Sequence, residues 1–142
     1  MPPIDERKRA LDFLISEANG WRSRVSGLVR QAANSPALQA GTLLVFVPQV
    51  GAVPDHWIPA TNLTGGTATG ILMYPMIANP GAIADSEAAI IVRDCEVAEP
   101  YLEWATWTDA ERAAAAASLS LNHVIVRKGV LRDQVVMPPI FP

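Results

Sequence analysis

The chain has 142 residues, the size of one domain that can bury a hydrophobic core without disulfides or metals. Half of its residues are apolar, and a net charge of −3 excludes a basic field for nucleic acid. Cys95 is the only cysteine and no apolar run approaches the roughly 20 residues of a membrane span, so we expect no disulfide framework and no membrane partner. The charged N-terminus lacks a signal-type apolar core, which predicts synthesis in the cytosol.

Residues 1–37 are predicted to form an N-terminal arm. Up to Arg30 the chain carries six basic and four acidic residues, whereas the remainder carries five basic and ten acidic residues. Residues 11–25 are predicted to form two short strands around a tight turn at Asn19-Gly20. In an isolated arm, bulky apolar and basic side chains either fold back on the domain or dock on a partner by strand addition, and we favour docking. The side chains expected to dock are Phe13, Leu14, Ile15, Trp21, Arg22 and Arg24.

The body, residues 38–127, is predicted to be mainly β. Its apolar runs have strand length, contain β-branched or aromatic residues, and end at proline or turn signals such as Asn79-Pro80-Gly81. The expected strands are residues 42–47, 56–59, 67–74, 88–93, 95–97 and 124–126.

One short α-helix is predicted within this body. Thr108 and Glu111 fit a capping box, in which the Thr108 hydroxyl accepts from the Glu111 amide and the Glu111 carboxylate reaches back to the Thr108 amide. Residues 113–117 are all alanine, which has the highest helix propensity, and the helix should end near residues 118–121. Residues 128–142 then form a proline-containing C-terminal tail that cannot be mostly regular.

The search for chemistry predicts no catalytic, cofactor or metal site. His56 and His123 lie in different predicted elements without ligand spacing. Asp94 and Glu96 would share one face of a strand, where a solvated edge is the ordinary interpretation. Acidic neighbours should raise the pKa of the Cys95 thiol, which argues against a nucleophile.

Trp104 and Trp107 stand just before the predicted helix. Core packing is one interpretation. A subunit contact is the other, because tryptophan is enriched at protein interfaces. The sequence leaves both open.

Taken in order, several segments resemble the bacteriophage head decoration proteins, the group related to the lambda capsid-stabilising protein. Residues 13–24 are similar to the family's Ser-Glu-x-x-Gly-aromatic-Arg-Ser-Arg pattern. The other matching segments are residues 38–44, 68–72, 89–97, 102–104, the alanine-rich helix and residues 124–127. The resemblance covers residues 12–127. Cys95 departs from the usual alanine, His123 stands where glycine or isoleucine is frequent, and the tail has no counterpart.

This resemblance implies a small β-tulip-like domain with one short α-helix, an extended N-terminal arm and a C-terminal tail. It also implies a homotrimer on the outside of the expanded capsid, at three-fold and quasi-three-fold positions, which reinforces the shell. The arm would order on the major capsid protein and add a strand to it. The implied location is the outer capsid surface of the virion, after synthesis in the host cytoplasm, and the protein would not be an enzyme.

Two other classes remain open from the residues. One is a virion or adhesion module that binds a glycan or receptor through exposed Trp57 or Trp104. The other is a small β-barrel enzyme with Asp94, Glu96 and His123 as its polar set, which requires a deep pocket around those groups.

Overall fold

The fold is described by a computed structural model, which defines residues 11–18, 22–60, 68–104 and 107–128. Within these ranges the chain is mainly β, with a single α-helix close to its C-terminal end. The elements in chain order are β1 (Leu14–Glu17), β2 (Arg24–Gln31), β3 (Leu43–Val47), β4 (His56–Pro59), β5 (Gly70–Leu72), β6 (Ala84–Ile91), β7 (Cys95–Ala98), the 3-10 helix η2 (Glu99–Tyr101), α1 (Asp109–Ser120) and β8 (Val124–Arg127).

Five strands close into a barrel in the order β2-β4-β3-β5-β6. The longest ladder joins β2 and β6 over eight antiparallel residue pairs, from Arg24 opposite Ile91 to Gln31 opposite Ala84. The barrel closes through a parallel contact between β2 and β4 at Val29 and Trp57. Closure leaves each of these strands with a neighbour on both sides, which removes exposed edges.

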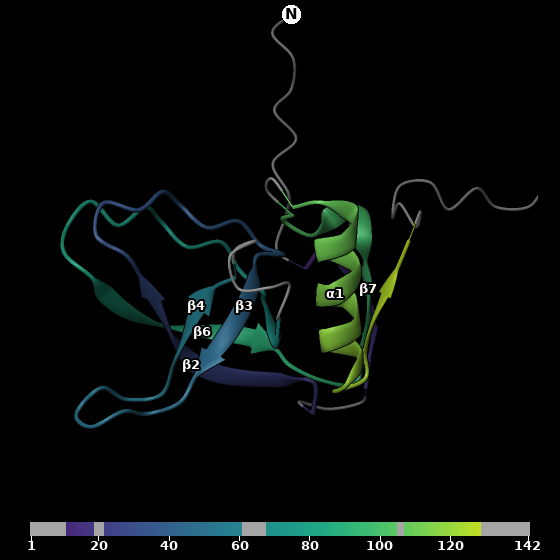
Figure 1. The fold of residues 1–142 in the computed structure, drawn as a ribbon, viewed down its shortest axis with the longest axis horizontal. Helices are drawn as coiled ribbons and strands as arrows, with labels where there is room; N and C mark the ends of the chain where they lie inside the picture. Colours follow the sequence, from purple (N-terminus) through teal and green to yellow (C-terminus); the bar gives the residue numbers. More distant parts are fainter. Residues whose placement is uncertain (1–10, 19–21, 61–67, 105–106, 129–142) are drawn as a thin grey trace, which may run out of the picture.

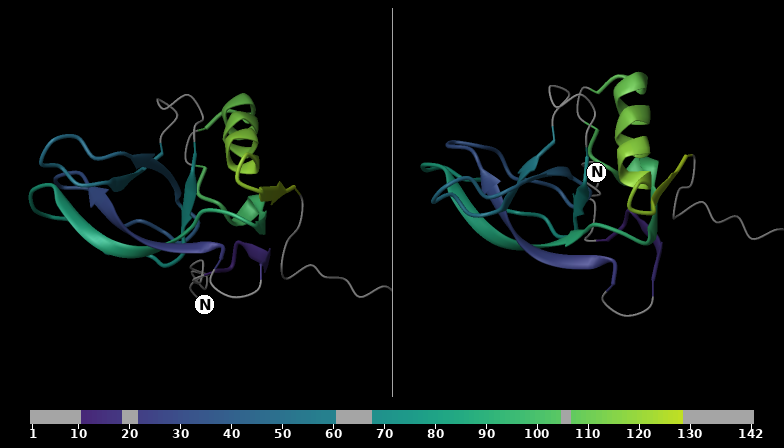
Figure 2. Two further views of the ribbon diagram at one scale, coloured as in Figure 1. Left: turned by 90° about the horizontal axis from the view of Figure 1, so that it is seen from below. Right: turned by 60° about the horizontal axis from the view of Figure 1, so that its bottom comes forward.

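The other three strands form an open sheet in the order β1-β7-β8. β1 runs antiparallel to β7 with a register shift between Leu14 and Ser16, and β8 runs parallel to β7. Figures 1 and 2 show this sheet and α1 beside the barrel, with β8 on the outside. The described chain therefore has two regions, a closed barrel and an open sheet with a helix.

Two apolar clusters hold these regions together. The smaller one fills the barrel around Val29, Leu44, Trp57, Leu72 and Ile90. The larger one lies between the barrel, the open sheet and α1. Its largest contributors are Phe13, Leu43, Ile71, Met73, Ile91, Val97, Leu102, Trp104, Trp107 and Leu119.

Two glycines make room for Trp57 inside the barrel. A Cβ at Gly27 would stand 2.8 Å from Nε1 of Trp57, and a Cβ at Gly70 would stand 2.8 Å from its Cζ3. The Gly70 Cβ would also lie 2.8 Å from Cγ2 of Ile90. Real side chains do not reach such distances, so the indole packs against two bare backbone positions.

The helix begins as predicted. Thr108 is its N-cap, and the Thr108 hydroxyl accepts a 3.2 Å hydrogen bond from the Glu111 amide. In the described structure Oε2 of Glu111 is buried without a hydrogen-bond partner. This oxygen therefore does not make the reciprocal bond to the Thr108 amide that the capping box predicts. The helix ends at Ser120 and turns into β8 through His123, which has a φ of +60°. Glycine adopts this left-handed backbone without strain, which explains why glycine is frequent at this position in the family that the sequence resembles.

Most predicted body strands are confirmed. β3, β4, β7 and β8 match their expected ranges to within one residue at each end. β5 is shorter than the expected residues 67–74, and β6 begins earlier than residue 88. No helix in the described ranges has the length and apolar character to cross a membrane.

The predicted hairpin around Asn19-Gly20 is wrong. β1 pairs with β7 and β2 pairs with β6 and β4, so the two strands belong to different sheets. The described residues of the expected arm contribute β1 and β2 to the two sheets, and the boundary at residue 37 stays a prediction. Residues 1–10 of the expected arm and residues 129–142 of the tail lie outside the described residues.

Candidate functional site

The open sheet is where the residues expected to bind a partner come together, but they divide into two kinds. Phe13 is 1% exposed and belongs to the large core cluster, so it anchors the chain to the domain. Leu14 is half-buried against the same cluster, whereas Ile15 is 42% exposed. Arg22 is exposed, and Trp21 lies outside the described residues. Ile15 and Arg22 are therefore the expected docking residues that face solvent.

Arg24 is engaged within the chain. Its guanidinium forms a two-pronged ion pair with Glu17, of which the Nε to Oε2 bond is 2.9 Å. The fully buried Ser23 hydroxyl donates to the same carboxylate. Hydrogen bonding from Arg24, with a smaller contribution from Ser23, lowers the pKa of Glu17. This Glu17 clamp, made of Glu17, Ser23 and Arg24, ties the end of β1 to the start of β2.

The Glu17 clamp is a feature that sequence reasoning missed. The signal was present, because an acidic residue and an arginine flank a predicted turn at Asn19-Gly20. The expectation of a free arm directed attention to Arg24 as a partner-binding group. The structure instead makes it a positioning residue for β1.

The outer face of the open sheet carries a polar row. Glu96 on β7 accepts from the Ser16 hydroxyl of β1 at 3.2 Å and from Arg127 of β8 at 2.6 Å. Arg127 is the larger of the two hydrogen-bond effects that lower the pKa of Glu96. These contacts cross-link the three strands, so the sheet presents a fixed surface.

Both outer strands of this sheet have one open side. In the described structure β1 and β8 each pair only with β7, and so each presents an unpaired edge to its surroundings. An unpaired edge of this kind is a template for strand addition by another segment. In the sequence, residues 1–10 come before β1 and residues 129–142 come after β8.

Trp104 and Trp107, considered from the sequence for core packing or for a subunit interface, lie in the core of the single chain, and a place at a trimer interface stays a prediction. Each is only 6% exposed in the single chain, and their rings meet edge to face at 5.7 Å. The Trp104 indole donates to the Glu99 carbonyl at 2.9 Å, and Arg112 stacks over the Trp104 ring at 5.6 Å. Core packing, the other interpretation from the sequence, accounts for both residues.

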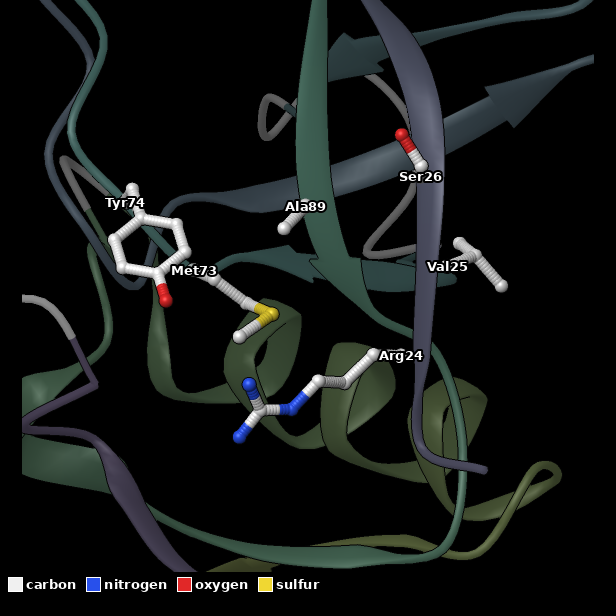
Figure 3. A pocket seen from close by; sticks show the side chains of 6 residues that line it. All are labelled: Arg24, Val25, Ser26, Met73, Tyr74 and Ala89. Carbon is white, nitrogen blue, oxygen red and sulfur yellow. The ribbon is translucent and has the colours of Figure 1, made fainter. Parts of the chain in front are cut away.

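A shallow hollow of about 250 Å³ lies beside the Glu17 clamp (Figure 3). Its lining residues are Arg24, Val25, Ser26, Met73, Tyr74 and Ala89. Met73 is fully buried, whereas Tyr74 is 47% exposed at the rim. The lining is mainly apolar and holds no acid–base pair, so it suits a side chain of a partner better than a reaction.

The residues considered for enzyme chemistry do not form a pocket. Glu96 is committed to Ser16 and Arg127, His123 is exposed, and neither they nor Asp94 line the hollow beside the Glu17 clamp. Burial, with smaller contributions from the nearby carboxylates, raises the pKa of Cys95 to about 12, so its thiol stays protonated. The described ranges hold no group of three or more histidine, cysteine or acidic residues suited to a metal.

The exposed aromatic platform required for a glycan-binding module is also missing at the expected places. Trp57 is 9% exposed inside the barrel, and Trp104 is 6% exposed. Both indoles contribute to the packing of the domain, which leaves little ring face for a sugar.

Comparison with known proteins identifies a family that matches this chain. The family model described as bacteriophage lambda head decoration protein D matches residues 3–124, which is most of the chain. No curated protein and no solved structure matches. The matched range includes all of β1 and ends at the first residue of β8.

Proposed function

The chain belongs to the family of bacteriophage lambda head decoration protein D, and we propose that it binds the major capsid protein as a homotrimer through its N-terminal segment. Membership of this family supports a structural role in capsid decoration and a place on the virion. The proposal adds the trimer, the three-fold and quasi-three-fold positions on the expanded shell, and the segment that makes contact.

The single observation that carries the contact is the unpaired edge of β1. Residues 1–10 precede this edge strand and contain the basic run Arg7-Lys8-Arg9. A segment that pairs with a coat-protein strand gains main-chain hydrogen bonds, and its side chains then provide specificity. We therefore shorten the docking arm from residues 1–37 to residues 1–10, together with exposed Ile15 and Arg22.

The remaining residues of the original arm have a supporting role in this proposal. Phe13 is buried and the Glu17 clamp fixes the end of β1, so the point from which residues 1–10 depart is held rigidly. Rigid support reduces the number of residues that must be ordered on binding. Each residue that is ordered costs roughly 1–2 kcal/mol of backbone entropy.

A trimer would make binding selective for an assembled shell. One short arm bound to one coat subunit is weak, because ordering it opposes the contacts that it gains. Three linked arms on correctly spaced sites raise the overall affinity by about 10²–10⁴. The protein would then bind the expanded lattice and ignore free coat subunits.

Co-sedimentation with expanded empty capsids tests the proposal. We expect a chain that lacks residues 1–10 to remain a folded trimer by light scattering and to lose capsid binding by about 100-fold or more. Leu121→Ala is the control outside the N-terminal segment, because Leu121 is 80% exposed at the C-cap of α1. Normal capsid binding by the truncated chain would refute the arm contact, and a monomeric full-length protein would refute the trimer.

A further inference from the structure

A second hollow, of about 390 Å³, opens between the barrel and the turn after α1. Its floor and walls are apolar, and three polar side chains stand at its rim. The apolar lining is Val25, Phe46, Trp57 and Val92, and the polar lining is Thr69, Arg93 and Asn122. We call this site the aromatic groove.

The aromatic groove exposes an unusual amount of apolar ring. Phe46 is 41% exposed, although its ring contacts buried Trp57 edge to face at 5.2 Å. Trp57 itself is only 9% exposed, so the groove presents mainly the Phe46 ring. A ligand for this groove should therefore bring an apolar group to that ring, with polar groups that can reach the polar lining residues.

The C-terminal end of the chain has this chemistry. Residues 138–142 read Pro-Pro-Ile-Phe-Pro, and proline-rich segments dock in aromatic grooves because their extended conformation is preformed and loses little entropy. Phe141 and Ile140 supply apolar groups, and backbone carbonyls supply acceptors for the polar lining, where Arg93 is held by its 2.6 Å hydrogen bond to the Arg22 carbonyl.

The chain is long enough to return to the groove. Fourteen residues follow Lys128, which span up to about 50 Å when extended. Asn122 of the groove lies two residues before β8, so the groove and the departure point of the tail flank the same strand. Tethering also gives an intramolecular segment an effective concentration in the millimolar range.

We propose that residues 138–142 bind the aromatic groove of their own chain, with Phe141 against Phe46 and Trp57. The interaction is independent of capsid binding through residues 1–10. It covers the exposed Phe46 ring.

The tetrapeptide Met-Pro-Pro-Ile occurs at residues 137–140 and again at residues 1–4. The N-terminal copy is followed by Asp5 and lacks the phenylalanine. It is therefore the natural competitor against which the C-terminal segment must be tested.

Proton–nitrogen NMR spectra test the proposal on the full-length protein and on a chain that ends at Met137. We expect truncation to shift the Trp57 indole signal and the amide signals of Val25, Val92 and Asn122. Signals of Ile77 and Ile83, which are exposed and do not line the groove, should stay in place. Phe141→Ala should reproduce the shifts, and Gln134→Ala should not.

Three outcomes would overturn the proposal. The first is a Trp57 signal that does not change on truncation. The second is a shift produced by removing residues 1–4 instead, which would make the N-terminal copy the occupant. The third is restoration of the full-length spectrum when labelled truncated protein is mixed with an equal amount of unlabelled full-length protein, which would make a second copy the occupant.

Discussion

The barrel and the open sheet differ in how they treat the backbone hydrogen-bonding groups at their strand edges. The barrel satisfies its strands by closure, and its interior is filled by its own cluster around Trp57. The open sheet keeps two unpaired edges and depends on α1, on the barrel and on Phe13 for its buried face. The comparison teaches that the barrel provides a scaffold, whereas both chain ends and the edges suited to partners belong to the sheet.

The largest expected effect is the loss of stability when the Phe13 side chain is removed from beneath the sheet. Phe13→Ala should lower the free energy of unfolding by about 3–5 kcal/mol, because it empties a fully buried site between the sheet and the barrel. Ile15→Ala, two residues away and 42% exposed, should change it by less than about 0.5 kcal/mol. Urea unfolding followed by circular dichroism at one protein concentration measures both. Equal effects would remove the distinction between anchoring and exposed residues in β1.

The next test concerns the interior of the barrel. Gly70→Val should destabilise the protein by about 1–3 kcal/mol, because a Cβ there already meets Trp57 and Ile90 at 2.8 Å. Gly81→Ala is the matched control, since its Cβ would lie 3.9 Å from Asn79 Oδ1 and should be neutral or stabilising by less than about 1 kcal/mol. Thermal unfolding would rank the two variants. A tolerated valine at residue 70 would show that the barrel is packed more loosely than the structure indicates.

A smaller effect is expected at the turn between α1 and the sheet. His123 has a φ of +60°, which costs an L-residue roughly 1–2 kcal/mol relative to glycine. His123→Gly should therefore raise the free energy of unfolding by up to about 1 kcal/mol, and His123→Val should lower it by a similar amount. Asn122→Gly should give no gain, because Asn122 is not among the positive-φ residues. A gain at residue 122 that matched residue 123 would refute the backbone explanation.

The smallest expected effect is the pH dependence of the Glu17 clamp. The clamp lowers the pKa of Glu17 below its ordinary value of 4.5 in the folded state. Its stabilisation is therefore present above that ordinary value and disappears as the pH falls through the lowered pKa. The pair is only partly buried, so Glu17→Gln should cost about 0.2–1 kcal/mol at pH 7 and progressively less in acid.

Unfolding curves of Glu17→Gln and of the unmodified protein between pH 7 and strongly acidic pH measure this difference. Glu87→Gln on β6 of the barrel is the control, since Glu87 accepts from Ser26 and has no arginine partner in the described structure. A Glu17→Gln difference that stayed constant with pH would mean that the clamp acts through shape and not through charge.

The sequence predicted the elements whose signals are local. The capping residue Thr108, the alanine run and the apolar runs of β3, β4, β7 and β8 are sufficient to define their elements, because propensity and turn chemistry act over a few residues. The overall fold class and the family followed from the order of these segments.

Strand pairing was not predictable in the same way. β1 and β2 are adjacent in sequence and look like a hairpin, but each finds a partner more than 50 residues away, at β7 and β6. The sequence indicated that Phe13 and Arg24 would face a partner. The residues that enclose them, such as Val97 and Glu17, become their neighbours only after those strand pairings form. For Trp104 and Trp107, the sequence allowed both core and interface, and burial favours the core.

The separation of 80 residues between Ser16 and Glu96 also sets an order of folding events. The pair β3 and β4 is local and can form early, whereas β1 has no partner until residues 95–98 have left the ribosome. Closing so long a loop is slow, and Phe13 remains exposed to water until β1 has paired with β7. The first strand to be synthesised is thus among the last to be secured, and a nascent chain is most prone to aggregation during this interval.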